Sequence, residues 1–106
     1  MEQSAQRLGG WSHPPKEASL GVQEICNQVR KEVEAKINGG KQFGQFVAKF
    51  YIEQVVAGLN YRIRVQINDV SLIRMQVFQG PMLDGVQAPP VLGDVAADGP
   101  LNDKPF

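Results

Sequence analysis

The sequence predicts an α+β fold, in which one long helix packs on an antiparallel sheet of four to five strands. Two observations predict it. A stretch with the helical hydrophobic period comes first, and after Gly40 the period changes to two, which is typical of strands. A helix with one apolar stripe and a sheet with one apolar face can bury those surfaces against each other. The 106 residues, 42% of them hydrophobic and 21% charged, match one globular domain spanning 1–106.

The N-terminal arm, residues 1–18, shows no hydrophobic period. It contains Gly9-Gly10 and Pro14-Pro15, and both pairs interrupt regular structure. The arm is therefore predicted to be extended and partly mobile.

The predicted helix follows the arm. Ser19 is the expected N-cap, because its hydroxyl can accept a hydrogen bond from a free N–H of the first turn. The helix is expected to end at Asn38-Gly39-Gly40, since glycine readily adopts the left-handed conformation found at many helix C-termini. The apolar stripe follows the helical spacing and consists of Val22, Ile25, Cys26, Val29 and Val33.

Four strands are predicted after the helix, at residues 46–56, 60–67, 71–79 and 91–97. The second and third alternate cleanly between apolar and polar side chains, as expected of half-buried antiparallel strands. Asn68-Asp69 turns the chain between them, and the glycines and proline of residues 80–85 predict a loop. The last strand is poor in large apolar residues, and the tail after Asp98 shows no regular pattern.

The inventory of reactive side chains argues against an enzyme. The one histidine, His13, lies in the arm. The one cysteine, Cys26, lies on the apolar stripe of the helix, where a thiol packs as a small hydrophobe rather than acting as a nucleophile. No residues have the spacing of metal ligands, and no glycine-rich loop joins a strand to a helix, so neither a metal nor a cofactor is expected.

Charge and hydropathy exclude further classes of partner. Eleven basic residues balance eleven acidic ones, so the chain has no long-range attraction for phosphate and nucleic acid is not expected. No apolar run approaches the ~18 residues of a membrane span, so no membrane partner is expected. The polar N-terminus lacks a secretory signal and the single cysteine allows no internal disulfide, which together predict a cytoplasmic protein.

Two turns, at residues 54–58 and 80–85, are expected at the same edge of the sheet, because alternate turns of an up-and-down sheet share an edge. Hairpin turns are usually polar, whereas the first of these carries two valines and an alanine before Gly58. Apolar side chains at a turn indicate a surface that a partner buries. The alternative, weighed equally, is that these side chains fold back onto the local core.

The first turn, Gln54-Val55-Val56-Ala57-Gly58, matches the Gln-Xaa-Val-Xaa-Gly motif of the cystatins, and the chain resembles the stefin group of that superfamily. The motif is short, but further segments resemble stefins at the expected places: Gly9-Gly10, Gln23-Glu24-Ile25, Asn60-Tyr61, Val77-Phe78-Gln79 and the tail 101–106. The arm is longer than in stefins, and Gly80-Pro81-Met82 stands where stefins carry Leu-Pro.

The resemblance implies a reversible, tight-binding inhibitor of papain-like cysteine proteases of the cathepsin type. Such an inhibitor blocks the active-site cleft as a wedge built from the N-terminal arm and two hairpin turns. The resemblance assigns protease binding to Leu8, Gly9, Gly10, Gln54, Val55, Val56, Ala57, Gly58, Pro81, Met82 and Leu83. Trp11 would either pack on the rim of the cleft or cover the helix.

Three alternatives remain open at this point. A cystatin-like fold could serve as a non-inhibitory interaction module, because a fold does not determine a function. A small enzyme or ligand-binding domain would need a concave pocket with convergent polar groups. A monomer is expected, but two copies could exchange strands through residues 54–58, which would bury the first turn and abolish inhibition.

Overall fold

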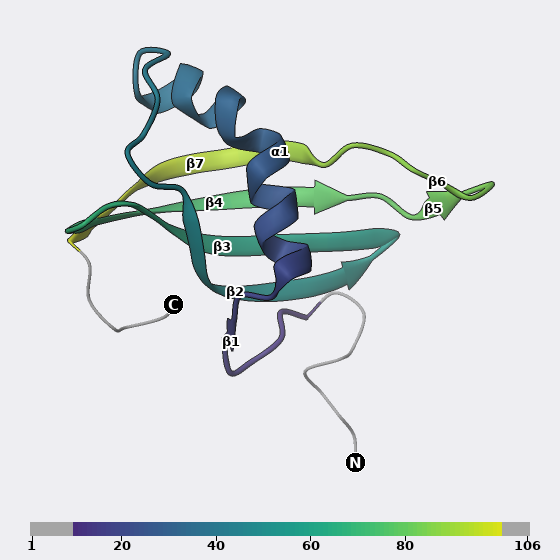
Figure 1. Cartoon of the computed structure of the whole chain (residues 1–106). Helices are drawn as coiled ribbons and strands as arrows, with labels where there is room; N and C mark the ends of the chain where they lie inside the picture. The colour runs from purple at the N-terminus through teal and green to yellow at the C-terminus, as the bar shows by residue number, and fades with distance from the viewer. Residues whose placement is uncertain (1–9, 101–106) are drawn as a thin grey trace.

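The computed structural model describes residues 10–100, in which one helix crosses one face of an antiparallel sheet (Figure 1). The helix is α1 (Leu20–Ile37). The sheet has five strands in the order β1-β2-β3-β4-β7. They are β1 (Lys16–Glu17), β2 (Val47–Val56), β3 (Gly58–Asn68), β4 (Ser71–Gln79) and β7 (Val91–Pro100). Two short strands, β5 (Met82–Leu83) and β6 (Val86–Gln87), form a separate hairpin. The predicted α+β fold is confirmed.

The ends of α1 lie where the sequence predicts them. The Val22 backbone N–H donates to Ser19 Oγ at 3.2 Å, so Ser19 is the N-cap. At the other end the Asn38 N–H still donates to the Glu34 carbonyl oxygen, and Gly39 and Gly40 then adopt φ values of 61° and 82°. Those left-handed conformations stop the helix and turn the chain back toward the sheet.

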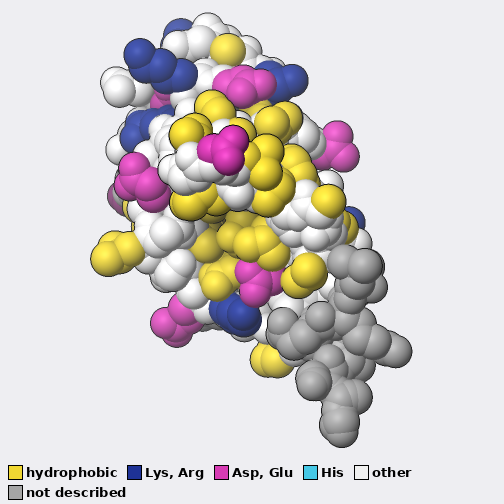
Figure 2. Space-filling model, turned by 90° about the vertical axis from the view of Figure 1, so that its right-hand side faces the viewer, with side chains coloured by type: hydrophobic (Ala, Val, Ile, Leu, Met, Phe, Trp, Pro, Cys, Tyr) yellow, Lys and Arg dark blue, Asp and Glu magenta, His cyan; other side chains and the backbone are white. Residues whose placement is uncertain are grey.

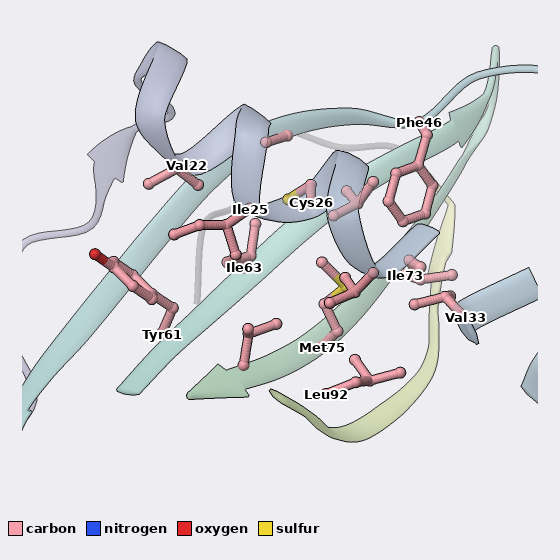
Figure 3. Close-up of a cluster of buried hydrophobic side chains, with 14 of the residues drawn as sticks. Val22, Ile25, Cys26, Val33, Phe46, Tyr61, Ile63, Ile73, Met75 and Leu92 are labelled. Atoms are coloured by element: carbon pink, nitrogen blue, oxygen red, sulfur yellow. The ribbon is translucent and has the colours of Figure 1, made fainter. Parts of the chain in front are cut away.

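The core lies between α1 and the sheet face that the helix covers (Figure 3). All five residues of the predicted helical stripe are buried there, and Cys26 and Val33 have no exposed surface. The sheet contributes alternate residues of its central strands, as their period of two predicts. These buried sheet residues are Ala48, Tyr61, Ile63, Val65, Ile73, Met75, Val77 and Leu92.

A buried carboxylate holds the connection between α1 and β2. Glu34 Oε2 accepts hydrogen bonds from Arg30 Nε at 2.8 Å and from the Phe43 backbone N–H at 2.9 Å. Arg30 also donates to the Phe43 carbonyl oxygen at 2.6 Å. The Arg30 hydrogen bond, with the Phe43 N–H second, lowers the pKa of Glu34 below its ordinary value. A charged side chain that is 5% exposed is therefore ion-paired and hydrogen-bonded, and it fixes the chain leading into the sheet.

The structure refines one expectation about the edges of the fold and corrects two. Part of the arm is a strand, because β1 pairs with β2, Lys16 lying opposite Tyr51. The predicted last strand is longer than 91–97 and continues to Pro100. Residues 80–85 are not a plain loop, since Met82 and Leu83 pair with Gln87 and Val86 to make a hairpin.

Candidate functional site

Both predicted turns lie at one end of the sheet, the right-hand end in Figure 1. The pairing of Leu59, at the start of β3, with Gln79, at the end of β4, brings them together. Figure 2 looks onto this end of the molecule and shows hydrophobic side chains gathered there. The shared edge that the strand order predicted is thus confirmed.

The first hairpin, β2–β3, is tighter than the predicted turn 54–58. Val56 pairs directly with Gly58, which leaves Ala57 alone at the tip. Gln54 still belongs to the ladder, opposite Asn60, whose Nδ2 donates to Gln54 Oε1 at 2.8 Å. The β-branched valines favour extended backbone, so the strand continues through most of the motif. Ladder pairing to Val56 makes this tip a preformed structure.

Gly58 makes the tight hairpin possible. Its φ is 129°, a conformation that residues with a side chain rarely adopt. A Cβ atom built on Gly58 would lie 3.0 Å from two ring atoms of Phe78 on β4. The glycine of the motif is therefore required both by its backbone conformation and by the closeness of the neighbouring strand.

The second hairpin, β5–β6, turns at Asp84-Gly85, whose φ values are 52° and 75°. Two consecutive positive φ values belong to the tight turns that favour Asp-Gly between strands. Two side-chain hydrogen bonds brace its base: Gln87 Nε2 donates to the Gly80 carbonyl oxygen, and Gln79 Nε2 donates to that of Ala88. The Asp-Gly pair flanked by apolar residues is the signal that would have predicted this hairpin.

Apolar side chains of the second hairpin face solvent. Met82 is 61% exposed, Leu83 67% and Val86 67%, and Pro81 is exposed as well. Val86 was not among the predicted site residues, because residues 80–85 were interpreted as a loop that ends before it. Exposed apolar residues clustered on a projecting hairpin are a feature of surfaces that bind partners.

Some apolar residues of the first hairpin are open to a partner, and one packs on the local core. Ala57 is exposed and Val55 and Val56 are half-buried, whereas Leu59 packs against the core. The tip is therefore available to a partner, and the following residue folds back onto the protein.

The arm reaches the first hairpin from the edge of the sheet. Trp11 forms an antiparallel bridge with Gln54, the first residue of the motif. Gly10 directly precedes Trp11 and therefore lies beside the first hairpin. Leu8 and Gly9, the other predicted residues of the arm, lie outside the described residues. The structure thus brings Gly10 together with the first hairpin, and nothing in the sequence pattern alone had placed the arm there.

The one cysteine of the sequence is not available at this end of the sheet. Cys26 lies in the core, where burial raises the pKa of its thiol to about 12, so it is a protonated thiol at neutral pH. Across residues 10–100, no three His, Cys, Asp or Glu side chains gather in a way that could hold a metal ion. In the same part of the chain, no helix is both long and apolar enough to cross a membrane.

A hollow of about 560 Å³ lies elsewhere, on strands β3, β4 and β7. Its polar lining residues are Arg62, Arg74, Gln76 and Asp94. No serine, cysteine or histidine is among the described residues that line it.

Comparison with known proteins agrees with the fold and the motif. A family model described as the cystatin domain matches residues 9–84. The chain is 38% identical over 77 residues to leukocyte cysteine proteinase inhibitor 1 of Sus scrofa, covering 73% of each chain. It is 43% identical over 72 residues to cystatin-A of Felis catus, covering 68% of this chain and 70% of that one. It is 39% identical over 72 residues to stefin-C of Bos taurus, covering 68% of each. The chain belongs to the cystatin family, and to the stefins within it.

Proposed function

We propose that this chain is a reversible, tight-binding inhibitor of papain-like cysteine proteases. Family membership supports inhibition, since a relative that is 38% identical is named a cysteine proteinase inhibitor. The observation that carries the proposal is the shared end of the sheet, where the Gln54–Gly58 motif forms a rigid tip beside a second hairpin with exposed apolar side chains.

The proposed interface has three parts. The first hairpin, Gln54 to Gly58, enters the active-site cleft at its centre. Pro81, Met82 and Leu83 of the second hairpin bind on the leaving-group side. Leu8 fills an apolar substrate pocket on the other side, and Gly9 and Gly10 let the arm lie flat along the cleft. Burying a leucine side chain in such a pocket contributes about 1.5–3 kcal/mol.

The mechanism we propose is occlusion by a wedge that is not itself cleaved. The residues on either side of the tip of the first hairpin pair with each other, so this tip offers no peptide bond to a catalytic cysteine in the orientation of a substrate. Ladder pairing also means that little conformational entropy is lost on binding, which favours tight complexes. An interface of about 1,600 Å² is typical of protease inhibitors of this rigidity.

The same proposal covers the remaining properties of the chain. It acts as a monomer and a single domain over residues 1–106, and it is not itself an enzyme. Its targets are proteases of the cathepsin type. The one cysteine of the sequence is buried in the core, which supports function in a reducing compartment such as the cytoplasm.

Titration of active papain with the purified chain tests the function. One molar equivalent is expected to abolish peptidase activity, dilution is expected to restore it, and mass spectrometry is expected to recover the chain intact. A folded monomer that leaves papain fully active would contradict the proposal and favour a non-inhibitory interaction module. Activity against papain found only in a dimer peak on size exclusion would contradict the monomeric wedge.

A further inference from the structure

The N-terminal arm is tied to β2 next to the first hairpin. The Ser12 N–H donates to the Glu53 carbonyl oxygen at 2.7 Å, and the Glu53 N–H donates to Ser12 Oγ at 3.0 Å. Ser12 is 2% exposed. This reciprocal pair and the Trp11–Gln54 bridge fix the backbone of two arm residues at the edge of the sheet.

A second contact ties the arm to β3. The Arg62 guanidinium carbon lies 4.3 Å from the centroid of the Trp11 ring, well within the range of a cation–π interaction. Tyr61 and Ile63 face the core, so Arg62 between them faces away from α1. Trp11 therefore does not cover the helix; its ring lies on the outer face of the sheet.

One side chain of the outer face is covered at this position. Ile52, which pairs with Arg62, is 3% exposed although it does not belong to the core beneath the helix. The Trp11 ring therefore contacts Arg62 on the same face of the sheet as the buried Ile52. The arm pairs with β2, and the Trp11 ring contacts β3. Together these two contacts restrict where the arm leaves the sheet.

We infer that Trp11 is a positioning residue for protease binding, which rests on the function proposed above. Held by Arg62, its ring fixes the arm at Gly10 beside the first hairpin, so that the residues before Gly10 start from a fixed point next to the hairpin tip. A chain without this contact must order the arm during binding and binds less tightly.

The test is a double-mutant cycle on papain inhibition in the full chain. Trp11→Ala is expected to raise the inhibition constant about fivefold, the size of effect that loss of a cation–π contact to an exposed arginine allows. In a Leu8→Ala background the same substitution is expected to change the inhibition constant less than about twofold, because no side chain is left to position. Trp11→Phe keeps an aromatic face and is expected to restore most of the affinity.

Arg62→Ala removes the cation that contacts the Trp11 ring, and Arg74→Ala is its matched control. Both arginines are exposed, lie on neighbouring strands and line the same hollow. Of these two, only Arg62 contacts an aromatic ring among residues 10–100. Arg62→Ala is expected to weaken inhibition and to shift the fluorescence emission of Trp11, the only tryptophan in the sequence. Arg74→Ala is expected to leave both unchanged.

Each other outcome overturns the inference. Equal losses from Trp11→Ala with and without Leu8 would mean that the ring contacts the protease or that the fold has weakened; thermal unfolding separates these two. An unchanged inhibition constant for Trp11→Ala overturns the positioning role alone. A wild-type chain that does not inhibit papain overturns the proposed function and this inference with it.

Discussion

Gly58 and Gln79 approach so closely that a Cβ atom on Gly58 would lie 2.6 Å from the Gln79 carbonyl oxygen. Gln79 is the last residue of β4, and its side chain braces the base of the second hairpin through Ala88. The tip of the first hairpin and the start of the second are therefore packed together at one point. The two hairpins are expected to act as a single surface.

Gly58→Ala is expected to weaken the protein and its inhibition together. The substitution places a Cβ against backbone at a φ of 129°, and positive-φ strain with a clash of this kind costs about 2 kcal/mol or more. Gly44→Ala is the control, because a Cβ on Gly44 meets nothing within 4 Å. Differential scanning calorimetry and papain titration check both variants. A Gly58→Ala variant with wild-type Tm would show that the close approach is not structurally required.

Leu83→Asp is expected to weaken papain inhibition without affecting stability. Leu83 is 67% exposed, so the free energy of unfolding should change by less than about 0.5 kcal/mol. If a protease buries Leu83, replacing it with a carboxylate should raise the inhibition constant at least about tenfold. Val70→Asp is the matched control, since Val70 is 66% exposed in the turn at the opposite end of β4. Equal inhibition by both variants would show that the second hairpin lies outside the interface.

Glu34→Gln is expected to lower the Tm at neutral pH by an amount that shrinks in acid. The hydrogen bonds from Arg30 and Phe43 hold the pKa of Glu34 below its ordinary value of 4.5. The charged form therefore stabilises the fold above that value, and the contribution is lost as pH falls through the lowered pKa. Glu32→Gln, an exposed position on the same helix, is the control. Tm measured from pH 3 to pH 7 checks this; a gap independent of pH would mean that the charge is not what Glu34 contributes.

The helix and the central strands could be predicted from sequence because local pattern and tertiary burial agree there. The stripe from Val22 to Val33 has one period and one buried face, and the alternation of residues 71–79 gives β4 its observed bounds. The Ser19 cap and the two glycines after Asn38 mark the helix ends chemically. In these elements each local preference points to the same structure.

The edges of the fold could not be predicted in the same way. Lys16 and Glu17 form a strand only because β2 offers them an unpaired edge, and two residues carry no period. β7 reaches Pro100 through pairing with Ser71, although its own sequence is rich in glycine and alanine. The position of Trp11 depends on Gln54 and Arg62, which are far from it in sequence. Such features are set by partners rather than by local pattern.

Val56→Asp is the sharpest test of the proposal that the hairpin end of the sheet occupies the protease cleft. Val56 is half-buried at the tip of the first hairpin, next to Ala57. The inhibition constants of the wild type, Val56→Asp and Val70→Asp are to be measured on papain, with circular dichroism to verify folding. We expect Val56→Asp to weaken inhibition by about 100-fold or more, because a carboxylate would be desolvated at the centre of the interface, and Val70→Asp to inhibit as the wild type does. A folded Val56→Asp variant that inhibits papain as tightly as the wild type would show that the first hairpin does not enter the cleft.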